Sequence, residues 1–92
     1  VRFIREPGVR SVVTLAGGAA EAVEMPINSD TPVLGKTLEQ MKLPEKVAVR
    51  AIVRSGKVII PEEADSVQDG DRIILVGLQQ DMIKAEKIFK RK

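Results

Sequence analysis

The 92-residue sequence has no cysteine, histidine, tryptophan or tyrosine, and its only aromatic residues are two phenylalanines. Without cysteine there is no disulfide framework, no thiolate metal site and no cysteine nucleophile. Without histidine the chain lacks the commonest general base and the commonest transition-metal ligand. Stacking on nucleic-acid bases would have to rest on phenylalanine or on arginine planes. These absences favour a protein that binds something over one that performs covalent chemistry.

Positive and negative charges are nearly balanced, because the chain has 15 basic and 13 acidic residues and a net charge of +2. This balance does not indicate nucleic acid as a partner. No apolar run approaches the roughly 20 residues that span a bilayer, and no signal peptide is present. Together with the missing cysteines, this predicts a cytoplasmic location. Because Val1 is not methionine, we expect a piece of a longer protein; a removed start methionine is the alternative.

The length predicts one domain, because a chain of this size buries roughly 60 to 65% of its unfolded surface. Its core must be built from aliphatic residues and methionine, since aromatics make up only 2% of the chain. Small cores of this kind are often completed by a partner surface. We therefore expect oligomerisation or attachment to a larger protein.

The first half of the chain predicts two strands and a short helix. Residues 9–15 are rich in β-branched side chains and fit a strand or a structured lead-in. Residues 22–27 alternate apolar and other side chains, which is typical of a half-buried strand. Pro26 places this strand at a sheet edge, or leaves it paired on one side only at that point. Residues 35–41 have the apolar spacing of a short helix.

The second half begins with a predicted hairpin. Residues 47–54 alternate, so that Ala48, Arg50, Ile52 and Arg54 are expected on one face of a strand and the intervening residues on the other. The dipeptide Ser55-Gly56 is a two-residue hairpin loop, and residues 57–60 return antiparallel until Pro61 ends the strand.

A tight turn at residues 69–71 leads into the apolar segment 72–77, which predicts a central strand with both faces covered. Residues 79–90 predict a helix whose core side carries Met82, Ala85, Ile88 and Phe89. The expected fold is α+β: a small mixed, largely antiparallel sheet covered by helices in two layers.

Four segments in fixed order carry a resemblance: residues 15–24 (LAGGAAEAVE), 33–38 (VLGKTL), 51–61 (AIVRSGKVIIP) and 70–74 (GDRII). In this order and spacing they resemble the TrkA-C domain, also called the RCK C-terminal domain. The resemblance covers residues 11–92. Residues 1–10 resemble the tail of a preceding nucleotide-binding domain, or a linker, in Trk-type potassium uptake regulators.

The resemblance implies a cytoplasmic regulatory domain that senses a ligand, acts as a homodimer and gates a membrane potassium transporter or channel subunit. It implies no cofactor in this domain, with NAD or another nucleotide bound by an upstream Rossmann-type domain. The ligand would be a small molecule or a nucleotide, and nucleic acid is not expected as a partner.

The candidate ligand-binding residues lie on the hairpin and at its end: Ala48, Arg50, Ile52, Arg54, Ile60 and Pro61. On one strand face the two arginines would lie about 13 Å apart. They could hold a phosphate or carboxylate through bidentate hydrogen bonds. The alternative is that they are solvated arginines that support solubility or a dimer contact.

One branch of the family binds cyclic di-AMP at the dimer interface, against this same region. The resemblance places that branch's Arg-Ala pair at Lys42-Leu43 and its asparagine at Ala48, while the proline is kept at Pro61. The guanidinium and the amide are therefore both missing from this chain. Their absence argues against cyclic di-AMP as the ligand.

Two further charged clusters have alternative interpretations. The acidic residues Glu62, Glu63, Asp65, Asp69 and Asp71 offer oxygen ligands for a hard cation, or form a solvated surface, and their spacing is not that of an EF-hand. In the tight turn, the last of these carboxylates can instead accept backbone N–H bonds. The basic residues at the end of the C-terminal helix suit the helix dipole as well as an anionic surface.

An enzyme without histidine or cysteine would need paired carboxylates or a serine with a lysine base, and no serine here sits in a nucleophile motif. The sequence therefore predicts no enzymatic activity. Two functions stay open. The first is a ligand-sensing regulatory domain, and the second is a dimerisation and coupling module without a ligand of its own.

Overall fold

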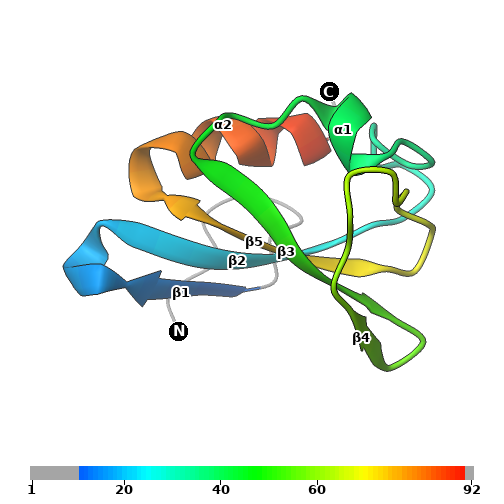
Figure 1. Ribbon diagram of the computed structural model, residues 1–92, viewed down its shortest axis with the longest axis horizontal. Coiled ribbons are helices and arrows are strands. Elements are labelled where there is room, and N and C mark those ends of the chain that lie inside the picture. The colour runs from blue at the N-terminus through cyan, green and yellow to red at the C-terminus, as the bar shows by residue number, and fades with distance from the viewer. Residues whose placement is uncertain (1–10, 91–92) are drawn as a thin grey trace.

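The computed structural model describes residues 11–90, which form a five-stranded antiparallel sheet in the order β1-β2-β5-β3-β4 (Figure 1). The elements are β1 (Ser11–Leu15), a 3₁₀ turn η1 (Ala16–Gly18), β2 (Ala20–Pro26), α1 (Leu38–Met41), β3 (Val47–Arg54), β4 (Lys57–Ile59), β5 (Arg72–Leu78) and α2 (Gln79–Phe89). The α+β prediction is confirmed. Every described strand pair is antiparallel, so the described sheet is not mixed. The expected tail at residues 1–10 lies outside the described residues.

The core lies between the sheet and α2, which packs along one face (Figure 1). Helix α2 presents Met82, Ala85 and Phe89 to the sheet, at the i, i+3 and i+7 spacing of one helix face. Below it lie the alternate, inward-facing residues of three strands: Val23, Met25, Val49, Ile52, Ile73 and Leu75. The predicted core side of this helix is confirmed. Neither described helix is long and apolar enough to cross a membrane.

Strand β2 is interior, because it pairs with β1 on one side and β5 on the other. The alternative of an edge strand is therefore wrong, whereas the alternative of pairing on one side only at Pro26 is confirmed for the described residues. Pro26 is accommodated in another way, since it is the last residue of β2 and lies opposite Arg72. The described part of β1 ends opposite Glu24, two residues earlier. A proline at this position removes no ladder hydrogen bond between the described residues of β1 and β2.

Helix α1 is shorter than residues 35–41. Gly35 has a φ of 83°, which is not helical, and Thr37 begins the helix as its N-cap. The Thr37 Oγ1 accepts the Gln40 N–H, and the Gln40 side chain accepts the Thr37 N–H in return. This reciprocal capping box fixes the start of the helix. Lys42 ends it in the left-handed conformation, with a φ of 54°.

A β-bulge at Arg50 overturns the predicted faces of β3. Val49 and Ala51 pair with Leu75 and Ile74, which are adjacent on β5, so Arg50 is an extra residue in the ladder. One extra residue moves every later side chain to the opposite face. Ala48 therefore faces away from α2, whereas Ile52 is buried beside the core and Arg54 follows it on the same side.

The predicted hairpin is confirmed. Ser55 and Gly56 both have positive φ, 53° and 76°, as a type I′ turn requires. Strand β4 pairs with the last three residues of β3 and forms an outer edge of the described sheet. On and just after this edge, Val58 is 68% exposed and Ile60 is 76% exposed.

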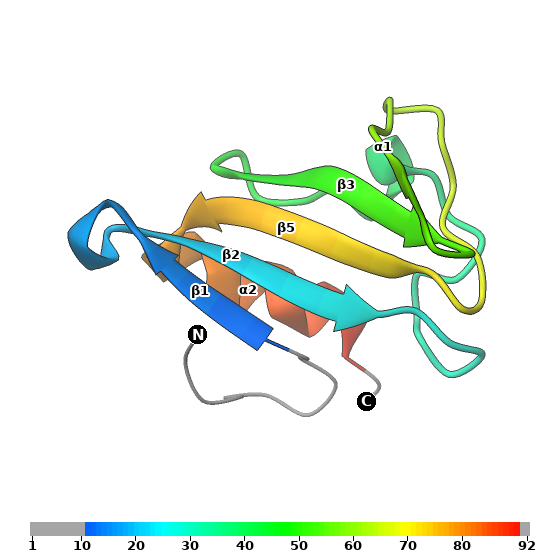
Figure 2. The same cartoon turned by 90° about the horizontal axis from the view of Figure 1, so that it is seen from below.

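Only one face of the central strand β5 is covered by a described element. In Figure 2, α2 lies behind the strands, and no described helix lies in front of them. Ile73 and Leu75 are buried under α2, while Ile74 and Val76 on the other side are only partly buried. The expected central position is confirmed. The expectation of cover on both faces is not met by the described residues.

The guanidinium of Arg54 donates two hydrogen bonds to the buried carboxylate of Asp71, with N–O distances of 2.9 and 2.8 Å, and forms a bidentate ion pair with it. The same guanidinium donates to the Ser66 carbonyl at 3.1 Å, and the Gln68 N–H donates to Asp71 at 2.8 Å. The predicted turn role of Asp71 is confirmed. Hydrogen bonding from Arg54 lowers the pKa of Asp71 below its usual value, and the same bond raises the pKa of Arg54.

Removing either partner of this pair destabilises the fold, but unequally. The side chain of Asp71 is 1% exposed and that of Arg54 is 30% exposed. Arg54→Met leaves a buried carboxylate without its cation and should cost about 3 kcal/mol of unfolding free energy. Asp71→Asn keeps a hydrogen-bond acceptor and leaves a guanidinium that is partly exposed to solvent, so about 1 to 2 kcal/mol is expected. Urea unfolding at pH 7 measures both, and equal losses would contradict this asymmetry.

The depressed pKa of Asp71 also predicts a pH dependence. As pH falls below about 4, the unfolded chain takes up a proton at Asp71 before the folded chain does. The stability that this carboxylate contributes is therefore complete above pH 4 and is lost as pH falls further. The difference in unfolding free energy between the native chain and Asp71→Asn should shrink between pH 6 and pH 3. A constant difference would show that the pair does not shift this pKa.

The bulge makes the outcome of two single deletions differ. Deleting Arg50 joins Val49 to Ala51 and keeps all later residues on their present faces, so the domain should fold with its melting temperature lowered by only a few degrees. Deleting Val53 is the matched control. It turns Arg54 away from Asp71 and should abolish cooperative unfolding. Circular dichroism melts compare the two, and equal damage would argue against a bulge at Arg50.

Candidate functional site

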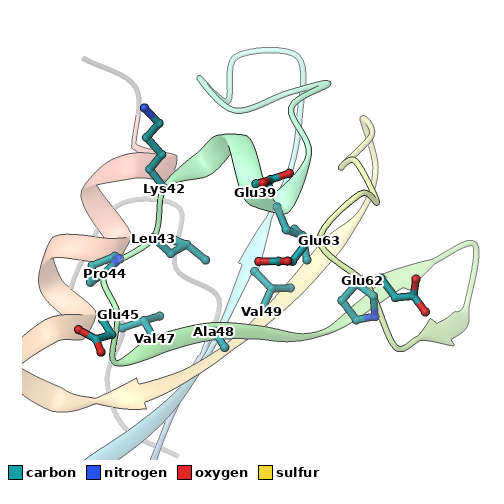
Figure 3. Close-up of a pocket in the computed structure, with 12 residues that line it drawn as sticks. Glu39, Lys42, Leu43, Pro44, Glu45, Val47, Ala48, Val49, Glu62 and Glu63 are labelled. Atoms are coloured by element: carbon teal, nitrogen blue, oxygen red, sulfur yellow. The ribbon is translucent and has the colours of Figure 1, made fainter.

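A cleft of about 420 Å³ lies where α1, the start of β3 and the segment after β4 meet (Figure 3). Its wall and floor residues come from three stretches of chain: Leu38, Glu39, Lys42, Leu43, Pro44, Glu45, Val47, Ala48, Val49, Pro61, Glu62 and Glu63. We refer to this hollow as the cleft. Two of the predicted ligand-binding residues, Ala48 and Pro61, line it.

Backbone hydrogen bonds join two walls of the cleft, α1 and the segment after β4. The first N–H groups of α1, on Leu38 and Glu39, donate to the carbonyls of Asp65 and Glu63 at 3.0 and 3.1 Å. The acidic segment after β4 therefore satisfies donors that a helix leaves unpaired at its N-terminus. In turn, the Asp65 carboxylate accepts the Glu62 N–H at 2.7 Å and tightens that segment into a turn.

The cleft has an apolar floor and a charged rim. Val47 and Val49 are buried at its base, and Leu43 is partly buried above them. Around the opening stand four glutamates and one lysine: Glu39, Glu45, Glu62, Glu63 and Lys42. All five are exposed. The rim therefore has an excess of negative charge, which attracts cationic groups and repels phosphates.

The six predicted site residues do not converge on one place. Ala48 and Pro61 line the cleft. Arg50 stands exposed on the bulge, and Ile60 is exposed beyond the edge strand. Ile52 is in the core, at 1% exposure. The predicted ligand role of these residues stays a prediction.

Arg54, the sixth predicted residue, has a structural role within the domain. Its guanidinium already makes three hydrogen bonds, two to Asp71 and one to the Ser66 carbonyl. The proposed pairing of this side chain with Arg50 on one strand face is wrong, because the bulge separates the two onto different faces. A phosphate clamp made by both arginines therefore cannot form on this strand.

Sequence reasoning missed several cleft residues, including Glu39 and Glu45 on the rim and Val47 and Val49 on the floor. The spacing of these residues gave no signal, because the rim is assembled from three separated segments of the chain. Within residues 11–90, no group of three or more acidic side chains is arranged to hold a metal ion. The acidic cluster after β4 instead serves its own turn and the cap of α1.

The fold and the sequence both have relatives. A Trk system potassium uptake protein TrkA homolog from Archaeoglobus fulgidus is 32% identical over 88 residues, which are 96% of this chain and 20% of that protein. TrkA homolog 2 from Methanosarcina mazei is 31% identical over 83 residues, 90% of this chain and 18% of that protein. The chain thus spans about a fifth of the length of these curated relatives.

Two solved structures share the fold. The GsuK RCK domain matches with a TM-score of 0.76 at 15% identity, over 91% of this chain and 18% of that chain. A structure of an RCK domain with cda matches with a TM-score of 0.62 at 17% identity, over 75% of this chain and 97% of that chain. The family model of the TrkA-C domain matches residues 22–90, three quarters of the sequence. The chain therefore belongs to the TrkA-C domain family.

Proposed function

We propose that this domain is a ligand-sensing regulatory module of a potassium uptake system, located in the cytoplasm and working as a homodimer on a membrane transporter or channel subunit. Family membership supports the regulatory role, because the similar proteins from Archaeoglobus and Methanosarcina are potassium uptake proteins. An upstream domain that binds NAD or another nucleotide is part of the same proposal, since this chain corresponds to about a fifth of those proteins.

The cleft is the structural feature that supports ligand sensing in this proposal. It combines an apolar floor with a charged rim, which is the usual composition of a small-molecule site. Its walls come from α1, β3 and the segment after β4, so a ligand would contact all three at once. A ligand that favours one arrangement of these elements shifts the population of the domain, and this shift would pass to the attached subunits.

The alternative function is a dimerisation and coupling module without a ligand. The charge of the cleft rim argues against an anionic ligand, because the rim carries four glutamates and one lysine. To that extent it supports the alternative. The missing arginine and asparagine, at Lys42-Leu43 and Ala48, point the same way for cyclic di-AMP. A cationic or neutral ligand meets neither objection.

Thermal denaturation with defined probes tests the ligand-sensing proposal. The probes are cyclic di-AMP, ATP, NAD, K⁺ and Ca²⁺, each at saturating concentration. A probe at 100 times its dissociation constant stabilises the folded state by about 2.7 kcal/mol. For a domain of this size that raises the melting temperature by roughly 10 °C or more. We expect at least one probe to do so.

Two tryptophan variants locate the effect. Glu63→Trp fills the cleft from its exposed wall and should abolish the shift. Asp69→Trp is the matched control, because it removes the same charge from an exposed turn outside the cleft and should keep the shift. No shift with any probe would favour the module without a ligand. A shift that survives Glu63→Trp would place the ligand elsewhere.

A further inference from the structure

The side of β3 that faces away from β5 has no described strand beside it over the first part of its length. Strand β4 pairs with β3 only from Ile52 to Arg54, so residues 47–51 have no partner strand on that side among the described residues. We call this side of residues 47–51 the free edge. At about 3.3 Å per residue it is roughly 13 Å long, which is enough for a short strand to lie against it.

Two features end the pairing of β3 with β4 at the same point. Continued one residue at a time beyond Ile52 and Ile59, the ladder would bring Pro61 opposite Arg50. Arg50 is the extra residue of the bulge, and bulges often terminate pairing beside functional sites. Pro61 has no N–H to donate to a ladder. Both strands therefore stop the pairing at this point, and the free edge follows from the residues of the hairpin.

The register of β3 determines which main-chain groups point toward the free edge. The Leu78 N–H donates to the Lys46 carbonyl at 3.3 Å, so the main chain of Lys46 faces β5. Because this direction alternates along a strand, Ala48 also faces β5, whereas Val47 and Val49 face the free edge. The Val47 N–H closes a turn with a carbonyl three residues earlier. The Val47 carbonyl and both main-chain groups of Val49 are therefore directed to the free edge, where these residues line the cleft.

The cleft provides side-chain contacts next to these main-chain groups. Figure 3 shows Leu43 and Val49 inside the cleft, between α1 and β3. Together with Val47 they form an apolar floor that suits aliphatic side chains. The exposed rim, with four glutamates and one lysine, attracts cationic side chains. A chain lying along the free edge would direct alternate side chains to the floor and the others to the rim.

An extended peptide meets all three requirements at once. When a peptide adds to a sheet edge as a strand, main-chain hydrogen bonds provide affinity and pockets for alternate side chains provide specificity. Here the free edge offers the hydrogen bonds, the floor accepts aliphatic side chains and the rim accepts lysine or arginine. A metal ion would not use the apolar floor, and a nucleotide would bring its phosphates to an acidic rim.

We propose that the cleft binds an extended segment of a partner protein, with basic and aliphatic residues in alternation, which adds to the free edge of β3 as a further strand. This inference rests on the proposed function and names the class of ligand that the cleft takes. The membrane subunit of the proposed function would offer suitable segments, because the cytoplasmic loops of membrane proteins carry an excess of lysine and arginine.

Isothermal titration calorimetry with two blocked pentapeptides tests the charge preference. The probes have the sequences Lys-Val-Lys-Val-Lys and Glu-Val-Glu-Val-Glu, which share their aliphatic residues and differ in the sign of charge. The lysine peptide should bind at least about tenfold more tightly than the glutamate peptide, and its affinity should fall with rising salt. Equal affinities for the two peptides would overturn the inference.

Single N-methyl groups on the lysine peptide test whether it binds as a strand. Consecutive amides of a strand point to opposite sides, so only every second amide can donate to the free edge. Of two peptides methylated at the second or at the third amide, one should lose binding and the other should keep most of it. Equal effects of the two methyl groups would contradict strand addition. This measurement uses the native chain, so it does not depend on a variant that folds.

A charge reversal on the rim locates the binding. Glu63→Lys should weaken binding of the lysine peptide about tenfold or more, because it reverses one charge of the rim. Asp69→Lys is the matched control, since it makes the same charge change at an exposed turn residue outside the cleft and should leave the dissociation constant unchanged. Circular dichroism checks that both variants are folded. Unchanged binding in Glu63→Lys would place the peptide elsewhere and overturn the inference.

The outcomes separate this inference from the proposed function. If the lysine peptide does not bind, but a small probe raises the melting temperature and loses this effect in Glu63→Trp, the inference is overturned and ligand sensing by the cleft stands. If neither the peptide nor any small probe binds, both are contradicted and the module without a ligand is favoured. Binding of the peptide alone, with the expected effects of methylation and of Glu63→Lys, supports both.

Discussion

The pair between Arg54 and the buried Asp71 is the constraint on which the hairpin side of the domain depends. It ties the end of β3 to the start of β5 and, through the Ser66 carbonyl, to the segment that follows β4. That segment in turn caps α1 through the carbonyls of Glu63 and Asp65. One charged pair thus sets the position of the cleft walls, although neither of its residues lines the cleft.

Most of the fold could be predicted from residue spacing, because most elements have one buried side. Strand β2 and helix α2 each show a single clear period, β5 is one apolar run, and the hairpin carries its own turn signal in Ser55-Gly56. The bulge could not be predicted. Residues 47–53 place valine, alanine or isoleucine on both sides of the strand, so the sequence fits either register equally well. Only the pairing with β5 shows that Arg50 is the extra residue.

The candidate site was less predictable, for a different physical reason. The guanidinium groups of Arg50 and Arg54 could each bind an anion. The residue type alone, however, does not determine which way the side chain points or whether another residue of the chain is already hydrogen-bonded to it. Asp71 lies 17 residues away from Arg54 in sequence and takes up its guanidinium. Ala48 and Pro61 do line the cleft, and they were found by resemblance to a family whose members share this fold. The acidic rim depends on three separated segments that come together only after folding.

The shortness of β4 has a consequence for recognition in the cleft. Among the described strands, β4 pairs with β3 only from Ile52 to Arg54, so the outer edge of β3 before the bulge has no strand beside it. This stretch runs along the cleft, at Ala48 and Val49. Main-chain amides and carbonyls at such an edge are hydrogen-bonding groups whose positions are set by register alone. Substitutions can therefore change the charge and shape of this cleft over evolution while its main-chain donors and acceptors stay in place.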